Sequence, residues 1–533
     1  MKTTSQTMRF ESTHSRTLGA NPGRGLDEKL TAGLPEPGSK VWAYTALTRQ
    51  GYRARVPNPL KEVLVRFIVR LLVLACLAAT VLAPAAAGAD RMWVGFHDDP
   101  MFRWDGTRLD ALDRARSNNA SILRTIVDWS KVAPDRPTEA TDPFDPAYQF
   151  GDVDEFVRNA QQRGLEVLIT LWGTPGWANG GQKPQAMPSN LADFQSFARA
   201  VASRYSGRYA GYPYVRFFTI WNESNLATFL VPQFNASGKI VSPANYAKLA
   251  RSGIAGIKAG NRSALVAIGE TSSNGRDKKS KGTDTVAPAT FMKGVAKALG
   301  KVRFDAWAQH PYPFPVNQKP TQLVRYPNVT LKSFPRFEKD LDAAFKRKNI
   351  PIWITEYGNE TKPGEPKGVT EAQQAAYIPQ AIAMASKDPR VQMFIWFVMQ
   401  DSPGSLWQSG IYRQDATPKR AQPRFARAAA PLDPVNGKMT VRGGTKNPKI
   451  TVYLREYCAN NPVGATVGYT IRSYLKTKLV QVSQGAAPLG IDCTVKPRVA
   501  KLTVAKKKTY RVTVTANTAT TAEVLRTITI VGK

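Results

Sequence analysis

The chain has 533 residues, of which 42% are hydrophobic and 10% aromatic, and its formal net charge is +34. These values exclude a disordered or collagen-like chain and a small disulfide-stapled scaffold, and the length predicts two to four domains. The positive charge is spread along the chain without a Cys/His finger, a basic helix leading into heptads or an aromatic ribonucleoprotein box, which argues against nucleic-acid binding.

The N-terminal part predicts export. Residues 71–83 form a short apolar stretch that follows Arg66 and Arg70 and precedes small residues in an A-x-A pattern. This pattern is typical of a secretory signal, so we expect residues 63–89 to be a signal peptide, or a signal anchor if they are not cleaved. Residues 1–62 are too long for a signal's basic region and are expected to be a poorly structured extension, which suggests a mis-assigned start.

A regular alternation of strand and helix patterns fills residues 90–420. The strand candidates are 93–97, 121–129, 166–172, 215–221, 264–270, 304–310, 351–356 and 391–397. Helix patterns lie between them at 107–118, 151–163, 190–206, 243–260, 286–299, 334–347 and 370–386, with a further one near 418–429. Eight such units predict a closed (β/α)8 TIM barrel with its active site at the carboxyl ends of the strands. An open doubly wound sheet is the alternative, but no phosphate-binding glycine motif follows the first strand.

The pattern changes after residue 420. Residues 421–438 are rich in basic residues, Ala and Pro and are expected to be a linker, and residues 439–533 alternate with period two, which predicts an accessory β-sandwich. Residues 431–533 carry 17 basic and 4 acidic side chains, so this domain is expected to contact an anionic cell-surface polymer. Cys458 and Cys493 are expected to form a disulfide, since neither has a metal-ligand spacing.

Two glutamates follow strands at the expected mouth of the barrel. The strand at 215–221 leads into Asn222 and Glu223, and the strand at 351–356 ends in Glu356. A carboxylate at this place must be hydrogen-bonded, paired or functional, because desolvating it is otherwise costly. The alternative for each is an ordinary solvated loop residue.

Alternation along the strands predicts which side chains face the barrel interior. It places Ile352, Ile354 and Glu356 inside, and it turns Trp353 and Trp307 toward the helices.

Three further residues lie at strand ends. His97 and Trp172 are candidates for sugar contacts, although both are also compatible with packing in the core. Glu270 is expected either to bind sugar hydroxyls or to take no part in the chemistry.

The order of these motifs on successive strands resembles the clan A glycoside hydrolases. The segment WNESN at 221–225 is similar to the clan's acid/base segment, and ITEYG at 354–358 is similar to its nucleophile segment. The cellulase-like family 5 pattern is similar to a further set of residues here, Arg124, the His310-x-Tyr312 pair and Trp396. In that family a Trp on the last strand forms the base of the cleavage subsite. The TPGW segment at 174–177 replaces the family's usual His after the third strand and looks more like family 39 enzymes.

The resemblance implies a retaining glycosidase that cleaves O-glycosidic bonds of a poly- or oligosaccharide by double displacement. Glu223 would be the acid/base and Glu356 the nucleophile. The residues expected to contact the sugar are Asn222, Arg124, His310, Tyr312 and Trp396. Arg124 and Tyr312 would keep Glu356 ionised, and the negative charge of Glu356 would keep Glu223 protonated. No metal or organic cofactor is required.

Two other functions use the same residues. A barrel that binds carbohydrate without cleaving it would need the aromatic side chains but not the acid pair. A transglycosylase would keep both glutamates and pass the glycosyl group to a sugar acceptor in place of water.

Overall fold

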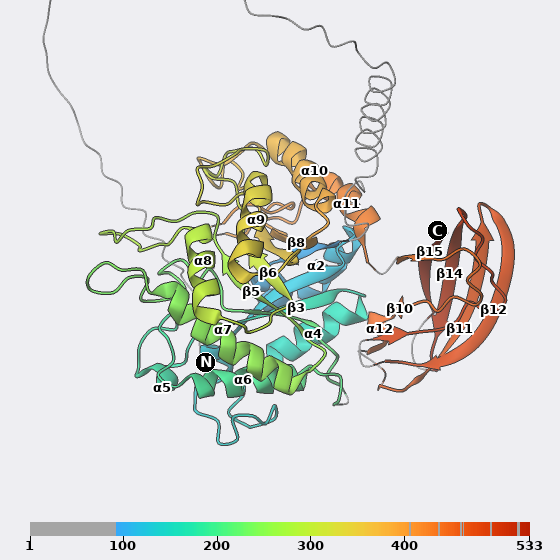
Figure 1. Ribbon diagram of the computed structural model, residues 1–533, viewed down its shortest axis with the longest axis horizontal. Coiled ribbons are helices and arrows are strands. Elements are labelled where there is room, and N and C mark those ends of the chain that lie inside the picture. Colours follow the sequence, from blue (N-terminus) through green and yellow to red (C-terminus); the bar gives the residue numbers. More distant parts are fainter. Residues whose placement is uncertain are drawn as a thin grey trace, which may run out of the picture. The chain divides into compact units, whose positions relative to one another are not determined.

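The computed structural model describes residues 92–533, except residues 210, 404–406, 435–436, 459–460, 462, 491–492 and 520–522 (Figure 1). The expected extension at 1–62 and the expected signal at 63–89 lie outside the described residues. Within the described part, no helix combines the length and the apolar character needed to span a membrane.

Eight parallel strands close into a barrel in chain order, as the alternating pattern predicts. Each strand pairs with the next along the chain, and β1 closes the barrel against β8 through the pairing of Trp93 with Met393. The strands are β1 (Trp93–His97), β2 (Ile122–Asp128), β3 (Glu166–Trp172), β4 (Phe217–Ile220), β5 (Leu265–Thr271), β6 (Ala306–Gln309), β7 (Ile352–Tyr357) and β8 (Val391–Phe397).

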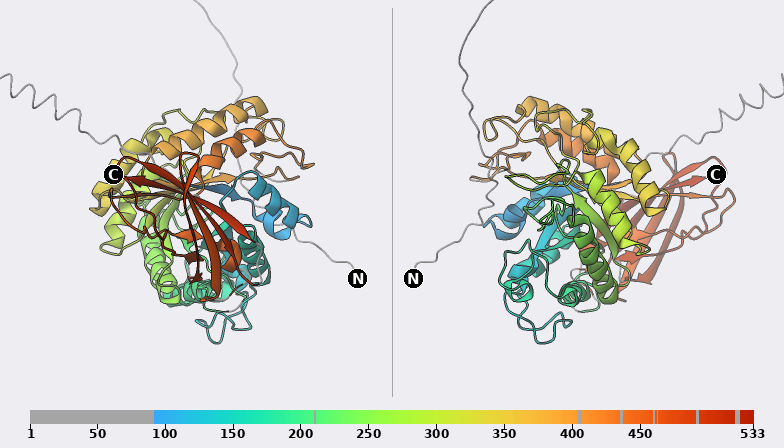
Figure 2. Two further views of the ribbon diagram at one scale, coloured as in Figure 1. Left: turned by 90° about the vertical axis from the view of Figure 1, so that its right-hand side faces the viewer. Right: turned by 60° about the vertical axis from the view of Figure 1, so that its left-hand side comes forward.

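Helices surround the barrel and occupy all eight expected positions (Figure 2). They are α2 (Arg108–Ser117), α4 (Gly151–Gln162), α6 (Leu191–Arg204), α7 (Ser242–Gly260), α8 (Pro288–Leu299), α9 (Phe334–Phe345), α10 (Glu371–Lys387) and α11 (Gln422–Ala429). Short α3 (Trp129–Val132) and α5 (Gly176–Asn179) follow β2 and β3. Local signals fix several starts: Asn190 caps α6, and Thr370 forms a capping box with Gln373 at α10.

Two apolar layers lie on the two faces of the barrel strands, and the expected facing of three residues on β7 is wrong. Trp353 lies in the barrel interior, 5.4 Å from the ring of Phe217, whereas Ile352 and Ile354 pack in the outer layer under the helices. Trp307 does face the helices, as expected, and packs against Phe337 and Phe345. The first residues of β7 therefore face the opposite way to the expectation: Ile352 faces the helices and Trp353 faces the barrel interior.

The barrel extends beyond the expected boundary at residue 420. Phe425 of α11 stacks on Phe96 of β1 with ring centroids 4.4 Å apart, and the N–H of Met92 donates to the carbonyl of Leu432. The first part of the expected linker at 421–438, Gln422–Ala429, is thus a barrel helix, because its apolar residues recur at helical spacing despite its basic and Pro-rich composition.

The C-terminal region is all-β apart from one helical turn, α12 (Arg455–Cys458). A five-stranded sheet in the order β12-β11-β14-β15-β9 and a two-stranded sheet, β10-β13, enclose one apolar core. The strands are β9 (Lys438–Val441), β10 (Val452–Tyr453), β11 (Thr466–Leu475), β12 (Lys478–Pro488), β13 (Thr494–Val495), β14 (Thr509–Asn517) and β15 (Val524–Gly532). The expected disulfide joins Cys458 to Cys493.

Removing this disulfide will destabilise the C-terminal region. The double variant Cys458→Ala, Cys493→Ala frees a loop whose ends are 35 residues apart, and the unfolding free energy of this region should fall by about 4 kcal/mol. Scanning calorimetry of the full chain would show the loss as a lower melting temperature for the C-terminal transition. An unchanged transition would contradict a stabilising role.

Candidate active site

Arg124 of β2 is the centre of a buried network of polar side chains at the carboxyl ends of the strands. Its side chain is fully buried, and all five of its N–H groups are directed at partners. Nε donates to Thr170 (2.9 Å), Nη1 contacts His97 Nδ1 (2.7 Å) and Glu356 Oε1, and Nη2 donates to Asn222 Oδ1 and Glu270 Oε2 (both 2.8 Å). We call these residues, together with Glu223, His310 and Tyr312, the Arg124 network.

A buried guanidinium requires this arrangement. An unpaired charge in the interior costs several kcal/mol, and the carboxylates of Glu356 and Glu270 supply the compensating negative charge. Both ion pairs are almost completely shielded from solvent. Arg124 therefore fixes the position of both carboxylates.

Glu356 reaches the network through a β-bulge. The β7–β8 register shifts between Ile354 and Tyr357, so that Thr355 and Glu356 fall within the irregular step and the carboxylate enters the mouth. Tyr312 donates to its Oε2 (2.9 Å), and His97 Nδ1 lies 3.4 Å from its Oε1. Burial alone would raise the pKa of Glu356, but the charges of His310 and Arg124 and the contact with His97 lower it well below its usual range. Glu356 is therefore ionised at neutral pH.

Glu223 lies on the turn that follows β4. Both Trp221 (φ 66°) and Glu223 (φ 34°) have positive φ, a backbone conformation that non-glycine residues rarely adopt and that is concentrated at functional sites. The side chain of Glu223 keeps 14% of its surface exposed at the mouth. Burial is the largest cause of its raised pKa, and the negative charge of Glu356 adds to it, while His310 acts in the opposite direction. Glu223 is thus shifted toward the protonated form.

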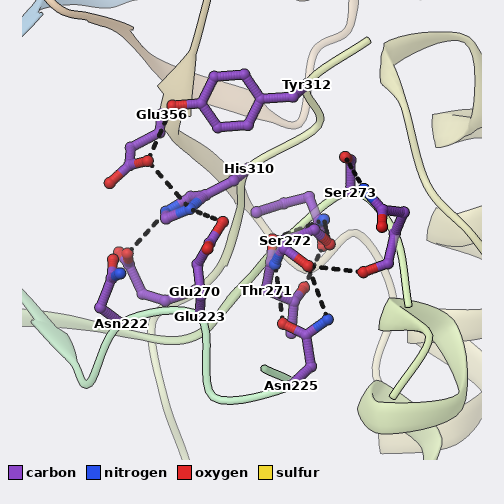
Figure 3. A network of polar contacts seen from close by, with 12 residues as sticks. Asn222, Glu223, Asn225, Glu270, Thr271, Ser272, Ser273, His310, Tyr312 and Glu356 are labelled. Carbon is purple, nitrogen blue, oxygen red and sulfur yellow. Dashed lines mark hydrogen bonds and ion pairs between the residues drawn. The ribbon is translucent and has the colours of Figure 1, made fainter. Parts of the chain in front are cut away.

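His310, from the segment after β6, lies between the carboxylates (Figure 3). Its Nδ1 is 3.0 Å from Glu223 Oε1, and its Nε2 is 2.9 Å from Glu270 Oε2. Burial would lower the pKa of this imidazole, but the charge of Glu356 and the hydrogen bonds to Glu223 and Glu270 raise it to about 10. His310 is therefore a cation that donates from both nitrogens.

The network brings together most of the residues proposed from sequence. The catalytic candidates Glu223 and Glu356 have oxygen atoms within 4.8 Å of one another. The candidates for sugar contacts that join them are Arg124, Asn222, His310, Tyr312 and His97. Thr170 and Glu270 also belong to the network, and only the strand-end position of Glu270 could have indicated it from sequence.

Two aromatic candidates lie elsewhere. Trp396 is completely buried in the outer layer, where its Nε1–H donates to the Ser409 carbonyl, so it offers no surface to a sugar. Trp172 packs against Trp221 and Phe229. The alternation along β8 explains the first difference, because Trp396 and Phe397 point to opposite faces.

Phe397 and Trp407 are two of the aromatic side chains that flank the network. The Phe397 ring lies 5.1 Å from that of His97, and the Trp407 ring lies 5.0 Å from that of Tyr312. Trp407 follows β8 in a segment without strand or helix pattern, so nothing in its sequence context indicated this position.

Glu223, His310 and Glu356 also have the composition of a metal site, since their ligand atoms lie within 4.8 Å of one another. An imidazole binds a metal through an unprotonated nitrogen. Both nitrogens of His310 are hydrogen-bonded to carboxylates and its pKa is raised to about 10, so the geometry favours a hydrogen-bond network over a ligand set.

Comparison with known proteins defines the class and then the family. Residues 87–402 match the family model described as Cellulase (glycosyl hydrolase family 5). The barrel with its paired glutamates is therefore that of a clan A glycoside hydrolase, and the protein is a glycosidase. The match covers more than half of the chain, which belongs to glycosyl hydrolase family 5.

Solved structures with a similar fold include members of two families. A family 39 glycoside hydrolase from the gut symbiont Bacteroides cellulosilyticus WH2 is 18% identical, with a TM-score of 0.48 over 77% of this chain and 81% of that one. GH5_18 from Streptomyces cattleya, in complex with GlcNAc, is 15% identical, with a TM-score of 0.47 over 67% of this chain and 85% of that one.

A curated relative matches a shorter part of the chain. The beta-glucosidase-like protein SFR2, chloroplastic, from Oryza sativa subsp. japonica is 27% identical over 126 residues. The match covers 22% of this chain and 18% of the relative, so the chain spans less than a fifth of that protein's length.

Replacing Arg124 will destabilise the barrel in a pH-dependent way. In Arg124→Met, Glu356 and Glu270 lose their buried cation, and the free energy of unfolding at pH 7 should fall by about 3–5 kcal/mol. The pKa values of both carboxyls are lowered in the folded protein, so their stabilising contribution is present above their ordinary pKa and is lost as the pH falls. The difference from wild type should therefore shrink toward pH 3 in urea titrations.

Arg136→Met is the matched control for this prediction. Arg136 is mostly exposed and pairs with Asp193 at the surface, so its loss should change stability by about 0.5 kcal/mol or less. Equal effects of the two substitutions, or a loss in Arg124→Met that does not depend on pH, would contradict the central role of Arg124.

Proposed function

We propose that the protein is an exported retaining glycoside hydrolase that cleaves O-glycosidic bonds of a poly- or oligosaccharide by double displacement. The observation that carries this proposal is the pairing of Glu223 and Glu356, whose oxygen atoms lie within 4.8 Å and whose pKa values are shifted in opposite directions. Carboxyl groups this close fit a retaining mechanism, since inverting enzymes need a wider gap, about 6.5–9.5 Å, for a water molecule.

In the first step, the ionised carboxylate of Glu356 attacks the anomeric carbon of the sugar. Arg124 and Tyr312 hold the Glu356 carboxylate by hydrogen bonds, which fixes its direction of attack. Glu223 donates its proton to the leaving glycosidic oxygen as the bond to the anomeric carbon breaks. The products are a glycosyl ester on Glu356 and a free sugar hydroxyl.

In the second step, Glu223 acts as a base. Esterification removes the negative charge of Glu356, and this charge is one of the causes that raise the pKa of Glu223. Glu223 is now ionised and takes a proton from the incoming water, whose oxygen attacks the anomeric carbon. Glu356 leaves as a carboxylate, and the sugar is released with its original anomeric configuration.

The opposite pKa shifts favour catalysis over simple carbohydrate binding. A binding module needs exposed aromatic faces and hydrogen-bond donors, but it gains nothing from one protonated and one ionised glutamate in contact distance. Transfer to a sugar acceptor would use the same two steps, and analysis of the products with added acceptor separates transfer from hydrolysis.

Export is supported by two features of the chain. The apolar stretch at 71–83 has the flanking residues of a secretory signal, and the disulfide between Cys458 and Cys493 is of the kind that persists in oxidising compartments. N-terminal sequencing of the secreted protein would locate the cleavage site expected near residues 87–89.

Substitution of the two glutamates tests the mechanism. Glu356→Ala should lower the hydrolysis of aryl glycosides by at least about 10³-fold, and azide should restore turnover with the inverted product, because a small anion can occupy the space of the lost carboxylate. Glu223→Ala should spare substrates with good leaving groups in the first step and should give the retained azide product. Reducing-sugar release across cellulose, xylan, mannan and β-1,3-glucan would identify the substrate.

Glu338→Gln is a matched control, because Glu338 is a mostly buried glutamate on α9 that lies outside the Arg124 network, and burial and the neighbouring Asp388 raise its pKa to about 8. It should retain wild-type kinetics. Full activity of Glu356→Ala, or inverted products from the wild type, would refute double displacement through these residues.

We further propose that the C-terminal sheet binds an anionic cell-surface polymer. Arg472 of β11 and Arg511 of β14 are exposed on the same face, since Arg472 pairs with Thr513, and the Arg511 guanidinium lies 4.4 Å from the Tyr474 ring. Full-length protein should bind an anionic polysaccharide in a salt-sensitive way, and Arg472→Glu with Arg511→Glu should weaken this binding about tenfold. Binding to the polysaccharide that is unaffected by salt and by the two substitutions would refute this proposal.

A further inference from the structure

Glu270 is a buried carboxylate for which the double-displacement steps have no role. Its side chain has no exposed surface, so it does not reach a substrate at the mouth. One oxygen, Oε2, accepts from both Arg124 Nη2 (2.8 Å) and His310 Nε2 (2.9 Å). Its other oxygen has no hydrogen-bond partner among the described residues. The carboxylate is thus committed to these two cationic side chains.

The backbone of β5 is distorted in a way that brings Glu270 into the barrel. Val266 and Ile268 pack under the helices and Ala267 faces the interior, so regular alternation would turn residue 270 outward. A β-bulge between Gly269 and Thr271 reverses this facing, and Glu270 has a positive φ of 46°.

Gly269 is required for this bulge. Its φ is 111°, and a Cβ at this position would lie 2.6 Å from the Trp307 ring. Glycine adopts this φ without strain, whereas the positive φ of Glu270 is a backbone conformation that non-glycine residues rarely adopt and that is concentrated at functional sites.

The ring of His310 connects Glu270 to both catalytic candidates. Its Nδ1 lies 3.0 Å from Glu223 Oε1 and 3.5 Å from Glu356 Oε2, while its Nε2 is held by Glu270 (Figure 3). A single N–H of His310 therefore faces the oxygen atoms of both glutamates.

We propose that Glu270 is a positioning residue that acts through His310: by accepting the Nε2–H bond it keeps the imidazole protonated and its Nδ1–H directed at Glu223 and Glu356. This inference rests on the proposed double displacement for its kinetic meaning, but the protonation of His310 can be measured without it. Glu270 itself does not touch the substrate.

The fixed proton has a use in each step of the reaction. Before the first step Glu356 is ionised, and His310 Nδ1–H supports its charge. After the glycosyl ester forms, the negative charge moves to Glu223, which lies closer to the same N–H. A neutral His310 could instead accept the proton of Glu223 and turn it away from the leaving oxygen. Glu270 prevents this by stabilising the imidazolium.

The charged and titratable groups around His310 come from five strands or their following loops. They are His97 at the end of β1, Arg124 on β2, Glu223 after β4, Glu270 on β5 and Glu356 on β7, and Tyr312 lies in the same segment as His310. Burial lowers the pKa of His310, and the glutamates together raise it to about 10. Its imidazolium form is therefore present below that pH and is lost as the pH rises through it.

Nuclear magnetic resonance of ¹⁵N-histidine-labelled full-length protein can test this directly, because the chain has only three histidines, His14, His97 and His310. The His310 signal is assigned by its loss in His310→Gln. In the wild type His310 should keep imidazolium shifts through pH 8.5. In Glu270→Gln its pKa should fall by at least about two units, since the neutral amide no longer balances the imidazolium.

The kinetics of Glu270→Gln should depend on pH in the same way. At pH 5.5, where His310 is protonated in both proteins, kcat should approach that of the wild type. At pH 8.5 kcat should be lower by about fourfold or more, with KM nearly unchanged, because Glu270 makes no contact with the substrate. A purely structural role would lower activity equally at both pH values.

Glu338→Gln makes the same chemical change outside the network and should alter neither the His310 signal nor the pH profile. A neutral His310 in the wild type at pH 7 would overturn the proposal, even if Glu270→Gln failed to fold. Identical His310 titrations in wild type and Glu270→Gln would also overturn it. Loss of the azide response of Glu356→Ala would refute the proposed mechanism and leave the His310 measurement intact.

Discussion

The site depends on the burial of one guanidinium. Arg124 lies inside the barrel with all five N–H groups directed at partners on β1, β3, β5 and β7 and on the turn after β4. Because a buried cation must be balanced by nearby anions, Glu270 and Glu356 are held where they lie. The ionised state and the direction of Glu356 follow from this requirement, and Asn222 is tied to the same group.

Besides His97, which pairs with Asp99, the charged groups of the Arg124 network are two cations and three glutamates. Arg124 and His310 together balance Glu270 and Glu356, so electroneutrality is reached when Glu223 carries its proton. When Glu356 becomes an ester, the same balance is restored by ionisation of Glu223. The buried charges therefore favour a protonated Glu223 before the first step and an ionised Glu223 before the second. The protein does not need to rearrange between the two steps.

The sequence predicted the elements well because strand and helix periods are local properties. All eight strands and eight helices lie within a few residues of their expected positions, and Glu223 and Glu356 were located from the strands that they follow. The facing of side chains was predicted less well. Trp353 lies inside the barrel and Trp396 outside it, because the facing of each side chain depends on the residue at which alternation begins. Glu356 still enters the mouth as expected, because the bulge in β7 reverses the facing after Ile354. The role of Glu270 could not be predicted from the sequence, because an alternation with a period of two residues does not reveal a β-bulge.

The bulges in β5 and β7 determine the side of the barrel wall on which Glu270 and Glu356 lie. A bulge is one extra residue in a strand, so deleting one residue at the bulge of β5 would restore regular pairing with β6 and would turn Glu270 beneath the helices. Deleting one residue between Ile354 and Tyr357 of β7 would turn Glu356 in the same way, while the other register shift of the β7–β8 pair, between Ile352 and Trp353, would remain. Such a deletion would take a counter-charge away from the buried Arg124, so it would lower stability and change the geometry of the site although every reactive residue type remained in the chain. Insertion or deletion of one residue in these strands would therefore change the site without changing any residue type, a difference that comparison of residue identities alone would overlook.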